Sequence, residues 1–194
     1  MGAVSLSLSP LTAHAANPLV AHVTSPRALG SVDAPITVVE LFSMTCSHCA
    51  NFHNNTFPEV KKRLIDTDML RFEMQPFPFD QYGLRAHALV RALPQHQYFP
   101  MVSYLLQDID RWARSTDPID ALRKIAQRQA GMTSTKFDLA MSEPIFEAII
   151  GMQQNAHKTW KIESTPSFVV NNKTIISGNI SYEEFASKID ATDV

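Results

Sequence analysis

Residues 36–49 read ITVVELFSMTCSHC, an apolar run followed by a C-x-x-C motif. Its first half, Ile36 to Phe42, is a β-branched and nearly continuous apolar run that follows the turn signal Asp33-Ala34-Pro35. Such a run is typical of a strand covered on both faces, which indicates a parallel or mixed sheet under helices. After Cys46 the apolar residues recur at helical spacing. The stretch therefore predicts a buried strand that leads directly into a helix.

The segments on either side extend this unit. Val20 to Thr24 is expected to form a short strand, and residues 69–77, MLRFEMQPF, alternate in the manner of another strand. Pro58 predicts a kink, or two helical segments meeting, in the helix after Cys46. From Gln81 to about Ala156 the pattern is mostly helical.

The C-terminal part predicts a hairpin and a closing helix. Two short strands, Ser167–Val170 and Thr174–Ile176, are joined by Asn171-Asn172-Lys173. An amphipathic helix is expected from about Ser181, because Ser181 and Glu184 form a capping-box pattern. The order of elements predicts an α/β fold with a βαβ half and a ββα half, separated by a helical insertion.

Four segments follow from this order. Residues 17–80 form the half with both cysteines, 81–156 the inserted helical domain, and 157–194 the second half. Residues 1–16 form a signal-like or flexible N-terminal segment, in which Ala13-His14-Ala15 resembles a secretory cleavage site although no Lys or Arg side chain precedes it. The sequence contains no run of 18 or more apolar residues, so a membrane-spanning helix is not expected.

Composition excludes several classes of protein. The 194 residues are 45% apolar and 19% charged, which is typical of a globular chain and not of a disordered or fibrous one. Seventeen basic and 19 acidic side chains give a net charge of −2 with no block of like charge. Nucleic-acid binding is not expected, because it needs a concentrated positive face.

The chain has two cysteines, Cys46 and Cys49. They are too few for a disulfide scaffold or a four-thiolate zinc site, and a C-x-x-C pair near a βαβ pattern indicates redox chemistry. At the start of a helix, Cys46 has a lowered pKa because free amide groups and the helix dipole favour its thiolate. His48 can add a partial positive charge and a hydrogen bond, and Cys49 is placed to attack Cys46 or to close a disulfide with it.

A metal half-site from Cys46, Cys49 and His53 is the alternative, but zinc needs four ligands in closed geometry. The histidines otherwise show no metal-ligand spacing, so His53 is interpreted as an ordinary histidine. We predict neither a metal nor another cofactor.

Two further features accompany the pair. Glu40 lies inside the apolar strand, where an unpaired carboxylate is costly to bury. It is either a strand-end residue facing water or a buried proton carrier beneath the cysteines, and the apolar run on both sides favours the second. Thr165-Pro166 directly precedes the hairpin, where a proline is tolerated as a strand begins.

These residues together resemble the DsbA family of thioredoxin-fold thiol–disulfide oxidoreductases. The resemblance rests on VVELFSMTCSHC (38–49), FPEVKK (57–62) and STPSFVVNNK (164–173), and it runs from about residue 30 to the C-terminus. It implies that Cys46 is the nucleophile, that Cys49 is the resolving thiol and that His48 stabilises the Cys46 thiolate. Glu40 corresponds to the family's buried acid.

The resemblance also implies a cis Thr165–Pro166 bond that faces the pair and offers backbone groups to an extended substrate, with Ser47 beside it. Oxidising members usually carry Pro-His between the cysteines, whereas this chain has Ser47-His48. We expect an enzyme that introduces disulfide bonds into reduced exported proteins, located in the periplasm or otherwise exported.

 We also expect a monomer that is reoxidised by a DsbB-like membrane oxidase. The alternatives are a disulfide isomerase or reductase of the same fold, and a metal-binding or chaperone-like protein without turnover.

Overall fold

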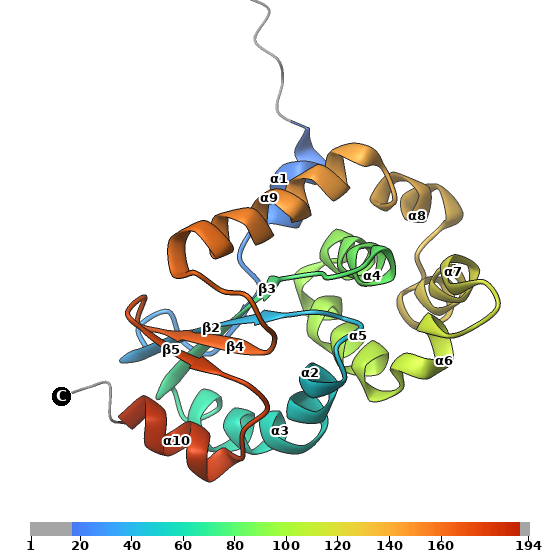
Figure 1. Ribbon diagram of the computed structural model, residues 1–194. Helices are drawn as coiled ribbons and strands as arrows, with labels where there is room; N and C mark the ends of the chain where they lie inside the picture. Colours follow the sequence, from blue (N-terminus) through green and yellow to red (C-terminus); the bar gives the residue numbers. More distant parts are fainter. Residues whose placement is uncertain (1–16, 191–194) are drawn as a thin grey trace, which may run out of the picture.

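The computed structural model describes residues 17–190, which form a five-stranded mixed sheet with helices on both faces (Figure 1). The strand order is β1-β3-β2-β4-β5. β2 pairs with β3 in parallel, and the other neighbouring pairs are antiparallel. The strands are β1 (Ala28–Leu29), β2 (Ile36–Phe42), β3 (Leu70–Pro76), β4 (Ser167–Val170) and β5 (Thr174–Ser177). The strand predictions for 36–42, 69–77 and the hairpin are therefore confirmed.

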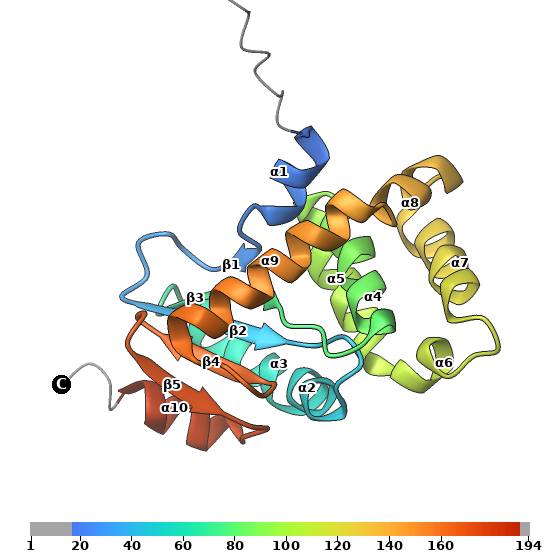
Figure 2. The same ribbon diagram turned by 45° about the horizontal axis from the view of Figure 1, so that its top comes forward.

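β2 is central, and its alternating side chains enter two separate apolar clusters. Val38 and Phe42 belong to the large cluster that contains Phe52, a residue of the helix that follows Cys46. Val39 and Leu41 pack on the opposite face, in the cluster that contains Ala156 of α9 (Glu143–Trp160). Figure 2 shows α9 lying across one face of the sheet, while α2, α3 and α10 lie on the other. Burial on both faces explains why β2 is apolar without strict alternation.

The helix after Cys46 contains two wide turns. It runs through α2 (Ser47–Asn51), the π-helical η1 (Phe52–Thr56), α3 (Phe57–Val60) and the π-helical η2 (Lys61–Ile65). The N–H of Phe57 donates to the carbonyl of Phe52, five residues back. Pro58 follows at the start of α3, where its missing N–H costs little. The predicted change of helical segment at Pro58 thus takes the form of a π-turn before it.

The helical insertion is confirmed. It contains α4 (Gln81–Ala92), α5 (Gln95–Gln107), α6 (Ile109–Ala113), α7 (Pro118–Ala130) and α8 (Ser134–Ala140). Asp108 leaves helical geometry and its side chain caps α6, so Ile109 begins a new helix. The turn between α7 and α8 carries Gly131 at φ +62°, a conformation that favours glycine.

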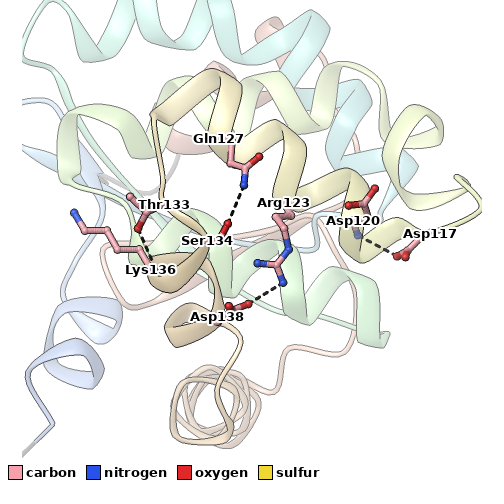
Figure 3. A network of polar contacts seen from close by, with 8 residues as sticks. All are labelled: Asp117, Asp120, Arg123, Gln127, Thr133, Ser134, Lys136 and Asp138. Atoms are coloured by element: carbon pink, nitrogen blue, oxygen red, sulfur yellow. Dashed lines mark hydrogen bonds and ion pairs between the residues drawn. The ribbon is translucent and has the colours of Figure 1, made fainter.

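Side chains join α7 to α8 across that turn (Figure 3). Arg123 donates to Asp138 at 2.7 Å, and Gln127 donates to Ser134 at 3.2 Å. Asp117 and Thr133 cap the first turns of the two helices. These contacts fix a helical hairpin at the edge of the insertion, far along the chain from the cysteines.

One element was predicted wrongly. Val20 to Thr24 lies in a helix, α1 (Pro18–Thr24), and not in a strand. The side chain of Asn17 accepts the N–H of Leu19, and Pro18 occupies the first turn, so both residues favour the start of a helix. Val23 is buried in a cluster with Ala88, Ile145 and Ile149. Tertiary packing and capping outweigh the β-branched residues that indicated a strand.

Under α1 lies a buried arginine centre, which we define as Arg91 with Arg27. Arg91 is fully buried, and its guanidinium donates to the carbonyls of Val23, Ser25 and Met74. Arg27 donates at 2.8 Å to the carbonyl of Arg91 itself. Burial lowers the pKa of Arg91. Because its acceptors come from α1, the following loop and β3, Arg91 joins the N-terminal segment to the sheet and to α4.

The C-terminal predictions are confirmed as well. Asn171 and Asn172 adopt positive φ in the hairpin turn, and the N–H of Glu184 donates to the Ser181 hydroxyl ahead of α10 (Tyr182–Asp190). The predicted boundary at residues 156 and 157 falls inside α9, and the division into domains stays a prediction. The signal-like segment 1–16 lies outside the described residues. No helix within residues 17–190 is long and apolar enough to cross a membrane.

Candidate active site

Cys46 lies at the junction that the sequence predicted, between β2 and α2. Its N–H donates to the carbonyl of Ser43 at 3.2 Å, which closes the loop after the strand. Its sulfur is the N-cap of α2 and accepts the N–H of Cys49 at 3.3 Å. Both thiols are free; Cys46 is partly exposed and Cys49 is fully buried. Only Cys46 can therefore meet a large reaction partner.

The surroundings of Cys46 favour its thiolate. They lower its pKa from 9.0 to about 5, chiefly through the hydrogen bond with the Cys49 thiol. Partial burial opposes this effect, and the nearby Thr165 side chain and the backbone N–H groups of Cys49 and His48 add to it. This is the expected behaviour of a thiol at the start of a helix.

His48 contributes to this stabilisation through its backbone, and its side chain is exposed. Ser47 is exposed beside it. Within residues 17–190, no hydrogen bond joins the His48 imidazole to Cys46. Stabilisation of the thiolate by the imidazole stays a prediction.

Cys49 has the opposite environment. Burial raises its pKa, as do the hydrogen bond to Cys46 and the negative charge of Glu40. Glu40 is fully buried, so its predicted burial is confirmed. One of its oxygens, Oε2, lies 2.8 Å from Nε2 of His53, and the other, Oε1, has no hydrogen-bond partner. A carboxylate with a free oxygen thus lies close enough to the resolving thiol to shift its titration.

His53 is the residue that sequence reasoning missed. It was interpreted as an ordinary histidine, yet it is buried and paired with Glu40. Its spacing carried a usable signal, because His53 follows Cys49 by four residues and such residues share one face of a helix. A polar residue on the face that also carries Cys49 and Phe52 points towards the sheet.

The Thr165–Pro166 peptide bond is cis, as the resemblance implied. It precedes β4 and lies against the redox pair, since Cys46 Sγ is 3.5 Å from the carbonyl oxygen of Thr165. Thr165 is buried, and its hydroxyl makes no hydrogen bond of ordinary geometry. The sheet therefore brings together two segments more than a hundred residues apart, each carrying part of the site.

The loop that carries Cys46 is also fixed to the helical insertion. The Thr45 hydroxyl donates to Oδ2 of Asp80, whose other oxygen caps α4 by accepting the N–H groups of Tyr82 and Gly83 at 2.8 Å. A Cβ atom at Gly83 would lie 3.0 Å from the Thr45 hydroxyl oxygen. The insertion thus packs closely on the residue that precedes the exposed cysteine.

Within the described part of the chain, no three His, Cys, Asp or Glu side chains are grouped to hold a metal ion. The absence of a metal stays a prediction. What the described side chains do provide is an acidic, accessible thiol with a second thiol beneath it. Such a dithiol can form a mixed disulfide at the first sulfur and resolve it with the second.

A family model described as thioredoxin matches residues 22–191. The chain belongs to the thioredoxin family. It is similar to proteins of Rickettsia bellii and Rickettsia felis that carry the provisional name protein-disulfide oxidoreductase, with 32% and 31% identity over 84% of this chain. The chain spans 62% and 58% of the length of these two curated relatives.

Solved structures place the chain more closely within the family. The crystal structure of alpha-DsbA1 from Wolbachia pipientis superposes with a TM-score of 0.77 at 28% identity, over 86% of this chain and 90% of that one. These similarities confirm the resemblance to DsbA-type proteins and the thioredoxin fold with a helical insertion. Residues 46–49, where the geometry places the two thiols, lie within the matched region.

Proposed function

We propose that this protein is a thiol–disulfide oxidoreductase that oxidises dithiols in other proteins through Cys46 and Cys49. The observation that carries the proposal is the unequal pair of thiols. The pKa of Cys46 falls to about 5 at a partly exposed helix start, while burial raises the pKa of Cys49 directly beneath it. The provisional names of the rickettsial relatives support the same activity.

The reaction begins with the Cys46–Cys49 disulfide. A substrate thiolate attacks Cys46 Sγ, a mixed disulfide forms, and Cys49 leaves with the electron pair of the broken bond. A second substrate thiolate then attacks the substrate sulfur of the mixed disulfide and displaces Cys46 as a thiolate. The substrate leaves as a disulfide and the enzyme as a dithiol. A stabilised Cys46 thiolate is a good leaving group and favours the reduced enzyme, which makes the disulfide oxidising.

The backbone of Thr165 and Pro166 would hold the substrate. In the reduced protein the Thr165 carbonyl lies against Cys46, so an extended peptide attached to Cys46 would meet this segment first. Ser47 is exposed beside Cys46 and would contact the same peptide. These contacts use backbone groups, which suits an enzyme acting on many sequences.

Exported proteins are the proposed substrates, a DsbB-like membrane oxidase the proposed reoxidant, and the periplasm or another exported location the proposed site of action. The Ala13-His14-Ala15 sequence and the DsbA-type relatives support these proposals. We further propose that the protein works as a monomer, because each part of the redox site comes from one chain.

The test is oxidation of a reduced, unfolded model protein by the purified disulfide form. We expect stoichiometric oxidation by the native protein and none by Cys46→Ser. Offered the model protein in its disulfide form instead, reduced Cys49→Ser should accumulate a mixed disulfide, because Cys46 attacks that disulfide and no second thiol resolves the product. A scrambled-disulfide substrate in parallel distinguishes an isomerase. The reduction potential against glutathione distinguishes an oxidant, near about −120 mV, from a reductant, near about −270 mV. Native protein that exchanges no disulfide and instead binds stoichiometric zinc would contradict the proposal.

A further inference from the structure

The buried Glu40–His53 pair, whose charge acts on Cys49, leaves one carboxylate oxygen without a hydrogen-bond partner. Its two side chains are 0% and 2% exposed, and the pair is joined through Glu40 Oε2 and His53 Nε2. Glu40 Oε1 and His53 Nδ1 are both buried without a hydrogen-bond partner. Buried polar atoms are normally hydrogen-bonded, so two open positions in one pair need an explanation.

The imidazole is held in place by aromatic rings. Its centroid lies 4.9 Å from the ring of Phe57, 5.6 Å from Phe52 and 5.9 Å from Phe42. These rings come from β2, η1 and α3, so the imidazole cannot turn freely away from Glu40. The contact with Glu40 therefore fixes which carboxylate oxygen stays open.

The other ionisable groups around the pair come from three helices. Cys46 and Cys49 lie on the α2 side, and the charge of Glu40 acts on Cys49 and on Tyr98 of α5. His87 of α4 packs on the far side of the Phe42 ring, at 4.8 Å between centroids. Glu59 of α3 is exposed, and the neighbouring residues of β4 and α10 are Phe168 and Phe185.

We propose that His53 is a positioning residue that shares a proton with Glu40 and directs it to Cys49 when the disulfide opens. This inference rests on the proposed function. When substrate attacks Cys46, the electron pair of the Cys46–Cys49 bond goes to Cys49, and the shared proton follows it. Cys49 leaves as a thiol, Glu40 remains a carboxylate, and the Nε2–H of neutral His53 donates to it. The reverse reaction returns the proton to the pair.

The proton is needed because of where Cys49 lies. A thiolate formed there would be buried beside a carboxylate, and the same surroundings raise the pKa of Cys49. Because these surroundings disfavour a thiolate, Cys49 departs faster when a proton reaches its sulfur in the transition state. His53 lies 2.8 Å from Glu40 Oε2 and can exchange a proton with it directly, which leaves Oε1 open towards its surroundings.

The experiment compares His53→Gln with the native protein in opening of the disulfide by a small thiol. Glutamine can keep an N–H donor towards Glu40 but does not titrate. The same small thiol attacks both proteins, so its ionisation affects both rates equally and does not change the ratio of the native rate to the variant rate. We expect this ratio to change by about tenfold or more between about pH 5 and about pH 8, because an imidazole can exchange a proton with Glu40 and an amide cannot.

The matched control is His87→Gln. His87 is also a buried histidine against the Phe42 ring, and it contacts the Phe42 carbonyl at 3.0 Å and not Glu40. For this variant the ratio of the native rate to the variant rate should not vary with pH. A ratio for His53→Gln that is equally flat would overturn the role of His53 while leaving the oxidoreductase intact. Native protein that opens no disulfide would overturn the proposed function and this inference together.

Discussion

The molecule contains two buried polar centres, and they are built differently. The arginine centre of Arg91 and Arg27 lies between α1, β3 and α4, and all three guanidinium nitrogens of Arg91 donate to backbone carbonyls. The Glu40–His53 pair lies beneath the redox motif, and each of its side chains keeps one polar atom without a partner. Both centres consist of ionisable side chains that are buried in the protein.

The difference separates a structural centre from a reactive one. Hydrogen bonds from all three guanidinium nitrogens hold Arg91 in a single state, which stabilises the fold, although Nε of the neighbouring Arg27 has no partner. A pair with open positions keeps two proton arrangements within reach, which lowers stability and permits proton transfer. Three measurements of stability test this difference between the two centres.

The largest effect is expected at the arginine centre. Arg91→Met keeps most of the side-chain volume but leaves the carbonyls of Val23, Ser25 and Met74 without this donor. Each unsatisfied group costs about 1–3 kcal/mol, so the free energy of unfolding should fall by about 3–5 kcal/mol in urea. Arg123→Met is the matched control, because Arg123 pairs with Asp138 at the surface and should lose less than about 1 kcal/mol. Equal losses in both variants would contradict the structural role.

A smaller, pH-dependent effect is expected at Cys46 in the reduced protein. Its pKa is 9.0 ordinarily and about 5 in the fold, so between these values the unfolded chain binds more protons than the native one. Stability should therefore rise with pH from about 5 to about 9 and lose this contribution below about 5. Above about 9 the raised pKa of Cys49 acts in the opposite sense.

Urea unfolding of the reduced protein at several pH values measures this slope. Cys46→Ser should lose it, whereas Arg91→Met should lower stability and keep it. A slope that persists in Cys46→Ser would show that another group titrates in this range.

The smallest effect is expected from Glu40→Gln, and its sign is opposite to that of Arg91→Met. In the reduced protein the change removes a buried carboxylate that has one unpartnered oxygen, so the free energy of unfolding at neutral pH should rise by about 1 kcal/mol. Thermal and urea unfolding measure it. A loss as large as that of Arg91→Met would mean that Glu40 is mainly structural, and the contrast between the two centres would fail.

Much of the fold was predictable, because its main signals are local. The apolar run of β2, the Asn-Asn turn of the hairpin and the capping residues of α10 each act within a few residues. The error at Val20–Thr24 shows the limit of this reasoning. Asn17 and Pro18 are equally local helix signals, but the burial of Val23 against α4 and α9 depends on the whole fold.

The site was predictable where chemistry depends on spacing along the chain. Cys46, Cys49 and the burial of Glu40 follow from a strand that enters a helix. His53 could not be paired with Glu40 by residue type alone, because that pairing depends on how the helix packs on the sheet. The buried arginine centre was missed for the same reason, since its acceptors come from three separate segments.

The pairing of β2 with β4 has a consequence for how the protein matures. The N–H of Thr37 donates to the side chain of Asn171, 134 residues further along the chain. Contacts between such distant residues form late, because a long loop must close first. A chain made or secreted from its N-terminus carries Cys46 and Cys49 well before Thr165 arrives beside them. The contribution of Thr165 to the lowered pKa of Cys46 is therefore added only when the C-terminal hairpin docks, after the local contribution of Cys49 and the helix start.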